Sequence, residues 1–214
     1  VLAAHTPPVS LITNSAMILR DPDILAPKAE RGLVSATISL TTLDKTLART
    51  MEPRASAPHR RLQAIQQLAT MGVPVNVLTA PIVPGLNDDE IERMLESAQS
   101  AGASHAGYVM LRLPLEIEAL FEEWLAAHYP DRASRVMNLV RGMHGGKAYD
   151  SRYGHRQRGD GPYAQMIADR FRSAANRLGL NGDRPKLRCD LFRWPVAPKR
   201  SGDQLSLFGD ASEG

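Results

Sequence analysis

Polar side chains and accessible backbone groups follow the apolar runs of this sequence, at the points where strands should end. They comprise Thr13, Asn14 and Ser15 after the first run, Ser39, Thr41 and Thr42 after the second, Thr79, Ala80 and Pro81 after the third, and Arg112 after the fourth. In parallel α/β proteins, functional groups gather at the carboxyl ends of the strands. This rim has few acids or bases, so it suits the binding of a polar cofactor better than proton transfer. The alternative for Ser39 and Thr41 is that they only cap the following helix.

Known catalytic signatures are missing from the sequence. It has no GxxxxGK[ST] phosphate loop, no GxSxG elbow and no HExxH zinc motif. Six histidines are scattered without metal-ligand spacing, and we expect them at the surface: His5, His59, His105, His128, His144 and His155. The lone Cys189 is interpreted as a buried or incidental thiol rather than a nucleophile.

Four β-rich apolar runs alternate with helical patterns in the first half of the chain. The runs cover 9–13, 34–40, 73–80 and 106–111, and the helical patterns between them cover 21–31, 58–71 and 87–101. This alternation predicts successive right-handed βαβ units and a parallel sheet.

The stretch 72–88, GVPVNVLTAPIVPGLND, combines a strand, a Pro- and Gly-shaped loop and a helix start. Asn87 should cap the new helix, with Glu90 three residues later as in a capping box. Ser56 should cap the helix that precedes this strand. Such a strand-to-helix loop either binds a ligand or is an ordinary connection.

The pattern changes after residue 113. Helices are predicted over 115–128, 131–143 and 163–178, with a Gly-rich basic loop before the last one. We divide the chain into a partial barrel over 1–114, a helical basic part of the same domain over 115–180, and an extension with a flexible tail over 181–214.

Charge is distributed unevenly along the chain. Residues 141–200 hold 14 Lys and Arg against 5 Asp and Glu, whereas the rest holds 12 against 18. A basic segment after an acidic part suggests an anionic partner, nucleic acid first. The candidate contact residues are Lys147, Arg152, Arg156 and Arg158. The alternative is a solvated helical face.

Length and composition narrow the class of protein. The chain has 214 residues, 43% of them hydrophobic, and a single cysteine. One cysteine permits neither a disulfide framework nor a cysteine-only metal site within this chain, and it suits the reducing cytoplasm. No apolar run approaches the roughly 20 residues of a membrane span. Because the sequence begins with Val1 and enters a strand-like run at once, we expect a fragment of a longer protein.

Several ordered segments resemble a known family. They are ITNSAMILRDPDIL, ATISLTTLDKTLARTMEPRASAPHRRLQAIQQLATMGVPVNVLTAPIVPGLND and GYVMLRLP, followed by YDSRYGHRQRGDGPYA and LFRWP. Together they resemble the C-terminal two-thirds of radical S-adenosylmethionine (SAM) proteins, in the spore-photoproduct-lyase-like subgroup of bacterial enzymes. The resemblance covers roughly residues 9 to 195. It implies an α/β fold that forms the C-terminal part of a partial (β/α)6 TIM-like barrel.

The resemblance also implies cofactors. In this family a CxxxCxxC loop holds a [4Fe–4S] cluster, which reductively cleaves SAM to a 5′-deoxyadenosyl radical. By motif match, Ser39 would face the ribose or methionine end, Ala80 would offer backbone contacts near the adenine, and 109–111, including Met110, would line the adenine side. With the strand-end residues, the candidate SAM-binding set is Thr13, Asn14, Ser39, Thr41, Ala80, Pro81 and Met110.

The chain departs from the family pattern in three respects. CxxxCxxC does not occur, so a cluster would have to be held outside these residues. The glycine-rich strand that should clamp the methionine amino group is missing as well. Asn14 stands where the family commonly has a lysine for the methionine carboxylate, and its amide brings no charge.

The C-terminal tail carries a second resemblance. Residues 204–208, QLSLF, resemble the pentapeptide with which bacterial proteins bind the DNA sliding clamp. The contact residues would be Gln204, Leu205, Leu207 and Phe208, with the apolar pair in a pocket and the glutamine at its rim. The alternative is a hydrophobic pair that docks on its own domain.

Three functional hypotheses follow. The first is part of a radical SAM iron–sulfur enzyme of a DNA-repair-like, lyase-like kind, inactive without its cluster-binding segment. The second is a non-enzymatic remnant that acts as an adaptor for nucleic acid and the sliding clamp. The third is an ordinary metabolic (β/α) enzyme, which the lack of an acid/base pair at the strand ends disfavours.

Overall fold

The computed structural model describes residues 6–149, 151–152, 156–183 and 186–192. It contains a four-stranded parallel sheet in the order β1-β2-β3-β4. The strands are β1 (Val9–Thr13), β2 (Val34–Ser39), β3 (Val75–Ile82) and β4 (His105–Met110). The α/β fold and the predicted parallel sheet are therefore confirmed, and this described sheet is open rather than closed into a barrel.

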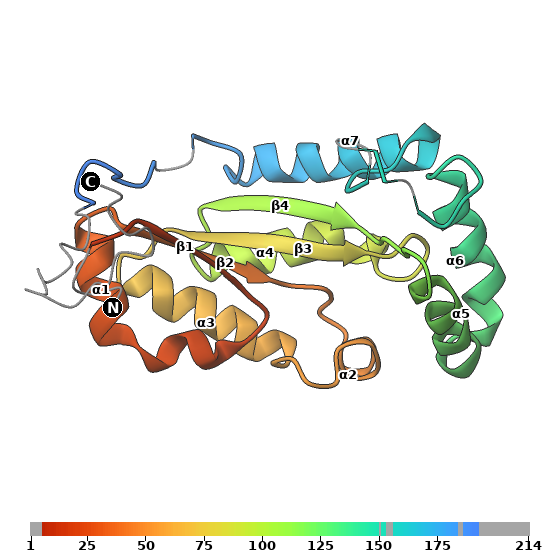
Figure 1. The fold of residues 1–214 in the computed structure, drawn as a ribbon, viewed down its shortest axis with the longest axis horizontal. Coiled ribbons are helices and arrows are strands. Elements are labelled where there is room, and N and C mark those ends of the chain that lie inside the picture. The colour runs from red at the N-terminus through yellow and green to blue at the C-terminus, as the bar shows by residue number, and fades with distance from the viewer. Residues whose placement is uncertain (1–5, 150, 153–155, 184–185, 193–214) are drawn as a thin grey trace, which may run out of the picture.

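The helices that join the strands cover one face of the sheet (Figure 1). The helices against this face are η1 (Ala16–Arg20), α1 (Pro22–Glu30), α3 (Pro58–Thr70) and α4 (Ile91–Ser100). The short helices α2 (Lys45–Met51) and η2 (Asp88–Glu90) belong to the connections that leave the carboxyl ends of β2 and β3. Side chains from α3 and α4 bury their apolar stripes against the alternate strand residues Val34, Ala36 and Ile38 and their neighbours. The period-2 burial of β2 fixes which strand residues face the helices and which face the open side.

Three further helices follow the sheet. They are α5 (Ile117–His128), α6 (Pro130–Gly142) and α7 (Gly161–Arg177). The α5–α6 pair lies beyond the carboxyl ends of the strands, and α7 runs alongside β4 (Figure 1). A second core forms where Phe121, Leu125 and Val140 pack on Val83 and Leu113. The helical part thus packs directly on the loops that leave β3 and β4.

Helix α7 is attached to α4 by ion pairs as well as by apolar contacts. Arg170 forms a bidentate pair with Glu92 at 2.9 and 2.7 Å, and Arg177 pairs with Glu96 at 2.9 Å. The pair with Arg170 lowers the pKa of Glu92. Part of the predicted basic excess of 141–200 therefore serves contacts within the fold.

Strand β3 differs from its prediction at both ends. It begins two residues later than expected and continues through Pro81 to Ile82, with a register shift against β4 between Thr79 and Ile82. Proline cannot donate to the ladder, so the irregularity lies where the sequence places Pro81. None of the described helices is long and apolar enough to cross a membrane.

Candidate functional site at the carboxyl edge of the sheet

The face of the sheet opposite the helices carries polar and apolar side chains. Ser35, Thr37 and Ser39 of β2 are half-exposed there, next to Asn76 of β3. The Asn76 amide donates to the Thr37 hydroxyl at 3.3 Å. Two apolar residues share this face by register, namely Ile12, which is 70% exposed and pairs with Thr37, and Leu78, which pairs with Ser39. The open face is therefore mixed, whereas the opposite face belongs to the core.

Ser39 stands at the carboxyl edge of this open face. Its hydroxyl donates to the Ala80 carbonyl at 3.2 Å, and the Thr41 hydroxyl lies 2.9 Å from the same oxygen. The Ala80–Pro81 peptide is cis. The structure therefore brings together the predicted residues Ser39, Thr41, Ala80 and Pro81, from the ends of two neighbouring strands.

A buried ion pair supports this edge from the helix side. Arg61 of α3 is 2% exposed and donates to Glu52 Oε2 at 2.7 Å, to the Ser39 carbonyl at 3.0 Å and to the Ser56 carbonyl at 2.7 Å. Thr41 also donates to Glu52 at 2.7 Å. One guanidinium thus holds the backbone of Ser39 and the loop after α2. The sequence analysis did not predict this ion pair. A signal was present, because Arg61 lies on the buried face of α3, where a charged residue indicates a buried partner.

Asn87 connects the loops that leave β2 and β3. It is fully buried, accepts from Val83 N–H at 2.7 Å, and donates to the carbonyls of Thr41 at 2.8 Å and Pro81 at 3.1 Å. Asn87 does stand at the N-cap position, but of the 3-10 helix η2 that precedes α4, and its side chain makes no cap bond. The expected cap by Ser56 is wrong, since its hydroxyl accepts from Ala16 N–H at 2.9 Å.

The loop between β3 and α4 is fixed to α7 by Asp88. This carboxylate accepts from Gly85 N–H at 2.8 Å and from the Tyr163 hydroxyl at 2.6 Å. Gly85 has a φ of 73°, which disfavours any side chain at this turn. Burial, and secondly the bond to Asp88, raise the pKa of Tyr163 to about 12.

The raised pKa of Tyr163 predicts a loss of stability at alkaline pH. The free tyrosine titrates near pH 10, so the unfolded chain loses its proton first. The contribution is therefore complete below pH 10 and disappears as the pH rises towards 12. Because Tyr163 is partly exposed, we expect a loss of about 1 kcal/mol. Denaturant unfolding at pH 8.0 and 11.5 should show a smaller decline for Tyr163→Phe than for the wild type, whereas Tyr129→Phe should follow the wild type. Equal declines in all three proteins would refute the assignment.

The remaining predicted cofactor residues lie at the ends of the two outer strands: Thr13 and Asn14 at β1, where Thr13 pairs with Ile38, and Met110 at β4. The Thr13 hydroxyl accepts from Ser15 N–H at 3.0 Å, and Asn14 is exposed, with its carbonyl accepting from Ser56 N–H at 3.3 Å. Met110 is 1% exposed and its side chain belongs to the core. Only the backbone of Met110 can therefore contact a ligand, and its N–H already donates to the Gln157 carbonyl at 2.9 Å.

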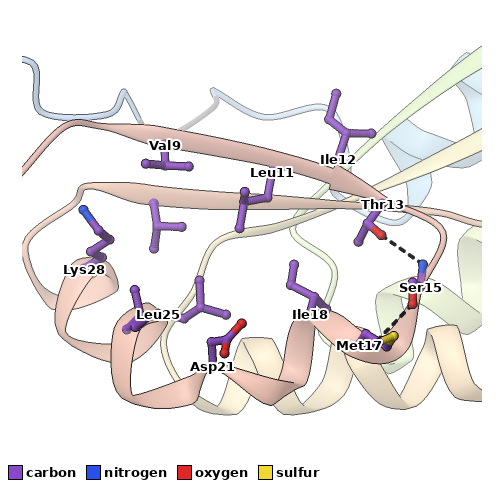
Figure 2. Close-up of a pocket in the computed structure, with 12 residues that line it drawn as sticks. Val9, Leu11, Ile12, Thr13, Ser15, Met17, Ile18, Asp21, Leu25 and Lys28 are labelled. Atoms are coloured by element: carbon purple, nitrogen blue, oxygen red, sulfur yellow. Dashed lines mark hydrogen bonds between the residues drawn. The ribbon is translucent and has the colours of Figure 1, made fainter. Parts of the chain in front are cut away.

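A hollow of about 380 Å³ lies on the helix side of β1, the outermost strand of the described sheet (Figure 2). Apolar side chains such as Leu11, Ile18 and Leu25 line it, and Thr13 points towards it. Lys28 stands at its rim and donates to the Pro7 carbonyl at 3.2 Å. The apolar lining of this hollow does not match a polar cofactor. Because Thr13 points towards the hollow, its side chain lies on the opposite face of the sheet from Ser39.

The predicted nucleic-acid residues lie on the segment between α6 and α7. This segment is attached to the end of β4, because Met110 donates to the Gln157 carbonyl and the Arg158 guanidinium lies 4.1 Å from the centre of the Tyr108 ring. Arg152 lies 3.4 Å from Asp160, and Arg156 is half-buried. The basic segment therefore borders the carboxyl edge of the sheet. The clamp-type residues Gln204, Leu205, Leu207 and Phe208 lie outside the described residues.

The prediction that the histidines lie at the surface is wrong for two of them. His105 and His144 are buried rather than at the surface, at 6% and 5% exposure. The ring of His105 is held between Ser104 Oγ and the Asp183 carbonyl, both at 3.0 Å. Cys189, expected to be buried or incidental, is exposed.

The residues of this chain do not fit an iron–sulfur cluster. Such a cluster needs several thiolates, whereas the sequence has the single Cys189. Across the described ranges, no group of three His, Cys, Asp or Glu residues could hold a metal ion. The hydroxyl, amide and backbone groups around Ser39 do fit a polar organic cofactor.

Comparisons with known proteins agree with the fold and the motifs. The model of the radical SAM superfamily matches residues 2–98. The uncharacterized proteins Rv2578c of Mycobacterium tuberculosis and Mb2609c of Mycobacterium bovis are each 31% identical over 142 residues, 65% of this chain and 42% of theirs. An uncharacterized protein of Acidianus two-tailed virus, ORF301, is 32% identical over 72 residues, which are 34% of this chain and 23% of the viral protein.

A solved structure of a spore photoproduct lyase mutant shares the fold. Its TM-score is 0.54 at 15% sequence identity, over 79% of this chain and 48% of the lyase chain. The chain thus spans less than half the length of the relatives and of the solved structure that it matches. In its parallel sheet, its strand-end motifs and the match over residues 2–98, the chain is similar to proteins of the radical SAM superfamily.

Proposed function

We propose that this chain forms the SAM-binding part of a radical enzyme that acts on nucleic acid in a DNA-repair-like role. One observation carries the proposal, namely the polar carboxyl edge of β2 and β3, where the Ser39 hydroxyl and the Ala80 backbone face the open side of the sheet. Ligands of parallel α/β folds bind at such an edge.

The donors and acceptors of this edge suit SAM. Ser39 would contact the ribose or methionine end, Asn14 the methionine carboxylate, and the Ala80 backbone the adenine. In this family bound SAM supplies the 5′-deoxyadenosyl radical, and the protein supplies binding and orientation. Because the residues of this chain do not fit the cluster, the chain's own contribution would be to bind and orient SAM.

The SAM proposal predicts a specific loss of affinity in Ser39→Ala. Removal of one hydrogen bond to the cofactor should weaken SAM binding about three- to tenfold in isothermal titration. Ser35→Ala is the matched control, because Ser35 lies four residues earlier on the same face of β2 and donates to the Ser10 hydroxyl at 3.2 Å. We expect Ser35→Ala to bind as the wild type does. Absence of binding by the wild-type chain, or equal losses in both variants, would contradict the proposal.

The basic segment between α6 and α7 supports nucleic acid as the substrate class. Lys147, Arg152, Arg156 and Arg158 lie on this segment, and its contacts with Met110 and Tyr108 attach it to the end of β4. Phosphate contacts release counterions, so binding should weaken steeply with salt. Fluorescence anisotropy with labelled oligonucleotides tests this, and failure to bind at low salt would count against it. The adaptor hypothesis, with the sliding clamp as partner of residues 204–208, stays a prediction from the sequence.

A further inference from the structure

His144 is a buried polar side chain with no use in the carboxyl-edge site. It follows the end of α6, is 5% exposed, and neither of its ring nitrogens has a hydrogen-bond partner in the part of the chain that the structure describes. Burial of a polar group without a partner costs about 1–3 kcal/mol. A ligand that formed a hydrogen bond with either ring nitrogen of His144 would offset part of this cost.

A hollow of about 420 Å³ with a mixed polar and apolar lining opens next to this ring. Every lining residue except the glycine has a side chain that can donate a hydrogen bond. The residues are His144, Gly145, Lys147, Tyr149, Ser151 and Arg152. No carboxylate is among them, although Arg152 shares its charge with Asp160 at 3.4 Å. The volume is in the range of pockets for small organic ligands.

The turn that follows α6 fixes one wall of this hollow. Gly145 and Gly146 turn the chain back after α6 with φ angles of 66° and 85°, and Gly146 N–H donates to the Arg141 carbonyl at 2.8 Å. Ala148 is buried in the core between α5 and α6. Lys147 therefore projects from a turn that is fixed both by the glycines before it and by the alanine after it.

We propose that this hollow binds a phosphate ester group, and specifically a backbone phosphate of the nucleic acid strand. Phosphate oxygens only accept hydrogen bonds, and the ammonium, guanidinium, hydroxyl and imidazole groups of the lining can all donate. A pocket larger than a bare ion suits a phosphate that carries its sugar. The choice of nucleic acid over a free nucleotide rests on the proposed function.

The decisive variant is His144→Leu. It removes both unsatisfied nitrogens, so the protein should unfold at the same or a higher denaturant concentration, whereas its affinity for a labelled oligonucleotide should fall about tenfold. Lys147→Ala should also weaken binding and reduce the slope of log K against log salt by about 1. His128→Leu is the matched control: this exposed histidine of α5 does not line the hollow.

The arms of the experiment separate the two proposals. Oligonucleotide binding that neither His144→Leu nor Lys147→Ala weakens would overturn the hollow and leave the proposed function standing. Absence of oligonucleotide binding by the wild type would overturn both. NMR of the His144 ring adds a direct readout: a shift on addition of the oligonucleotide supports the proposal, and a shift with inorganic phosphate or a nucleoside monophosphate but not with the oligonucleotide reassigns the hollow to a free ligand and overturns it.

Discussion

Arg61→Met is expected to destabilise the protein by about 3 kcal/mol, one of the largest effects of a single substitution in this chain. Methionine fills a similar volume but cannot donate. The Glu52 carboxylate then loses its partner at 2.7 Å, and the carbonyls of Ser39 and Ser56 lose theirs. Glu52 is 19% exposed, so water can reach part of it and the loss should stay below the upper end for buried pairs.

Denaturant unfolding measures this loss directly. Arg60→Met is the matched control, because Arg60 is the exposed neighbour on the same helix, and we expect a change within about 0.5 kcal/mol. The double variant Arg61→Met with Glu52→Gln should regain part of the stability, since the unpaired charge is gone. A loss for Arg61→Met no greater than that of Arg60→Met would show that the pair does not support the edge.

The strands were predictable because their side chains alternate between two different surroundings. Val34, Ala36 and Ile38 must be apolar where helices cover them, and the residues between them tolerate hydroxyls. A β-rich run of this kind needs little information from elsewhere in the chain.

Helix α2 was missed because it is short. It has seven residues, too few for a clear period, and its signal is the cap: Asp44 accepts from Thr46 N–H at 2.6 Å and from Leu47 N–H at 3.2 Å. The local signal of Asn87 and Glu90 was clear but misleading. It resembles a capping box, but Glu90 accepts from Leu43 N–H at 2.9 Å, 47 residues away.

The basic charge of residues 141–200 predicted a binding surface, but some of its arginines form ion pairs within the fold. Arg170 and Arg177 neutralise carboxylates of α4 that lie 78 and 81 residues earlier. A count along the sequence cannot separate such arginines from those of a binding surface. The sequence already made the segment between α6 and α7 a candidate site, but only the contacts of Gln157 and Arg158 show that it lies at the end of β4.

Asn87→Ala should cost about 3 kcal/mol, because one amide serves three buried backbone groups. The substitution leaves Val83 N–H and the carbonyls of Thr41 and Pro81 without this partner. Asn87→Asp should be at least as damaging. It keeps an acceptor for Val83, but it turns a carboxylate oxygen towards the two carbonyls and buries a charge in a position that is fully buried.

The two variants together test what Asn87 does for the site. Because Thr41 also contacts the Ala80 carbonyl, loosening of this link should reach the edge that carries Ser39, and SAM affinity should fall along with stability. Asn138→Ala, an exposed asparagine of α6, should change the free energy of unfolding by no more than about 0.5 kcal/mol. Unfolding curves and titrations of all three proteins decide the matter: SAM affinity that survives in a destabilised Asn87→Ala would separate the cofactor site from the loop network beneath it.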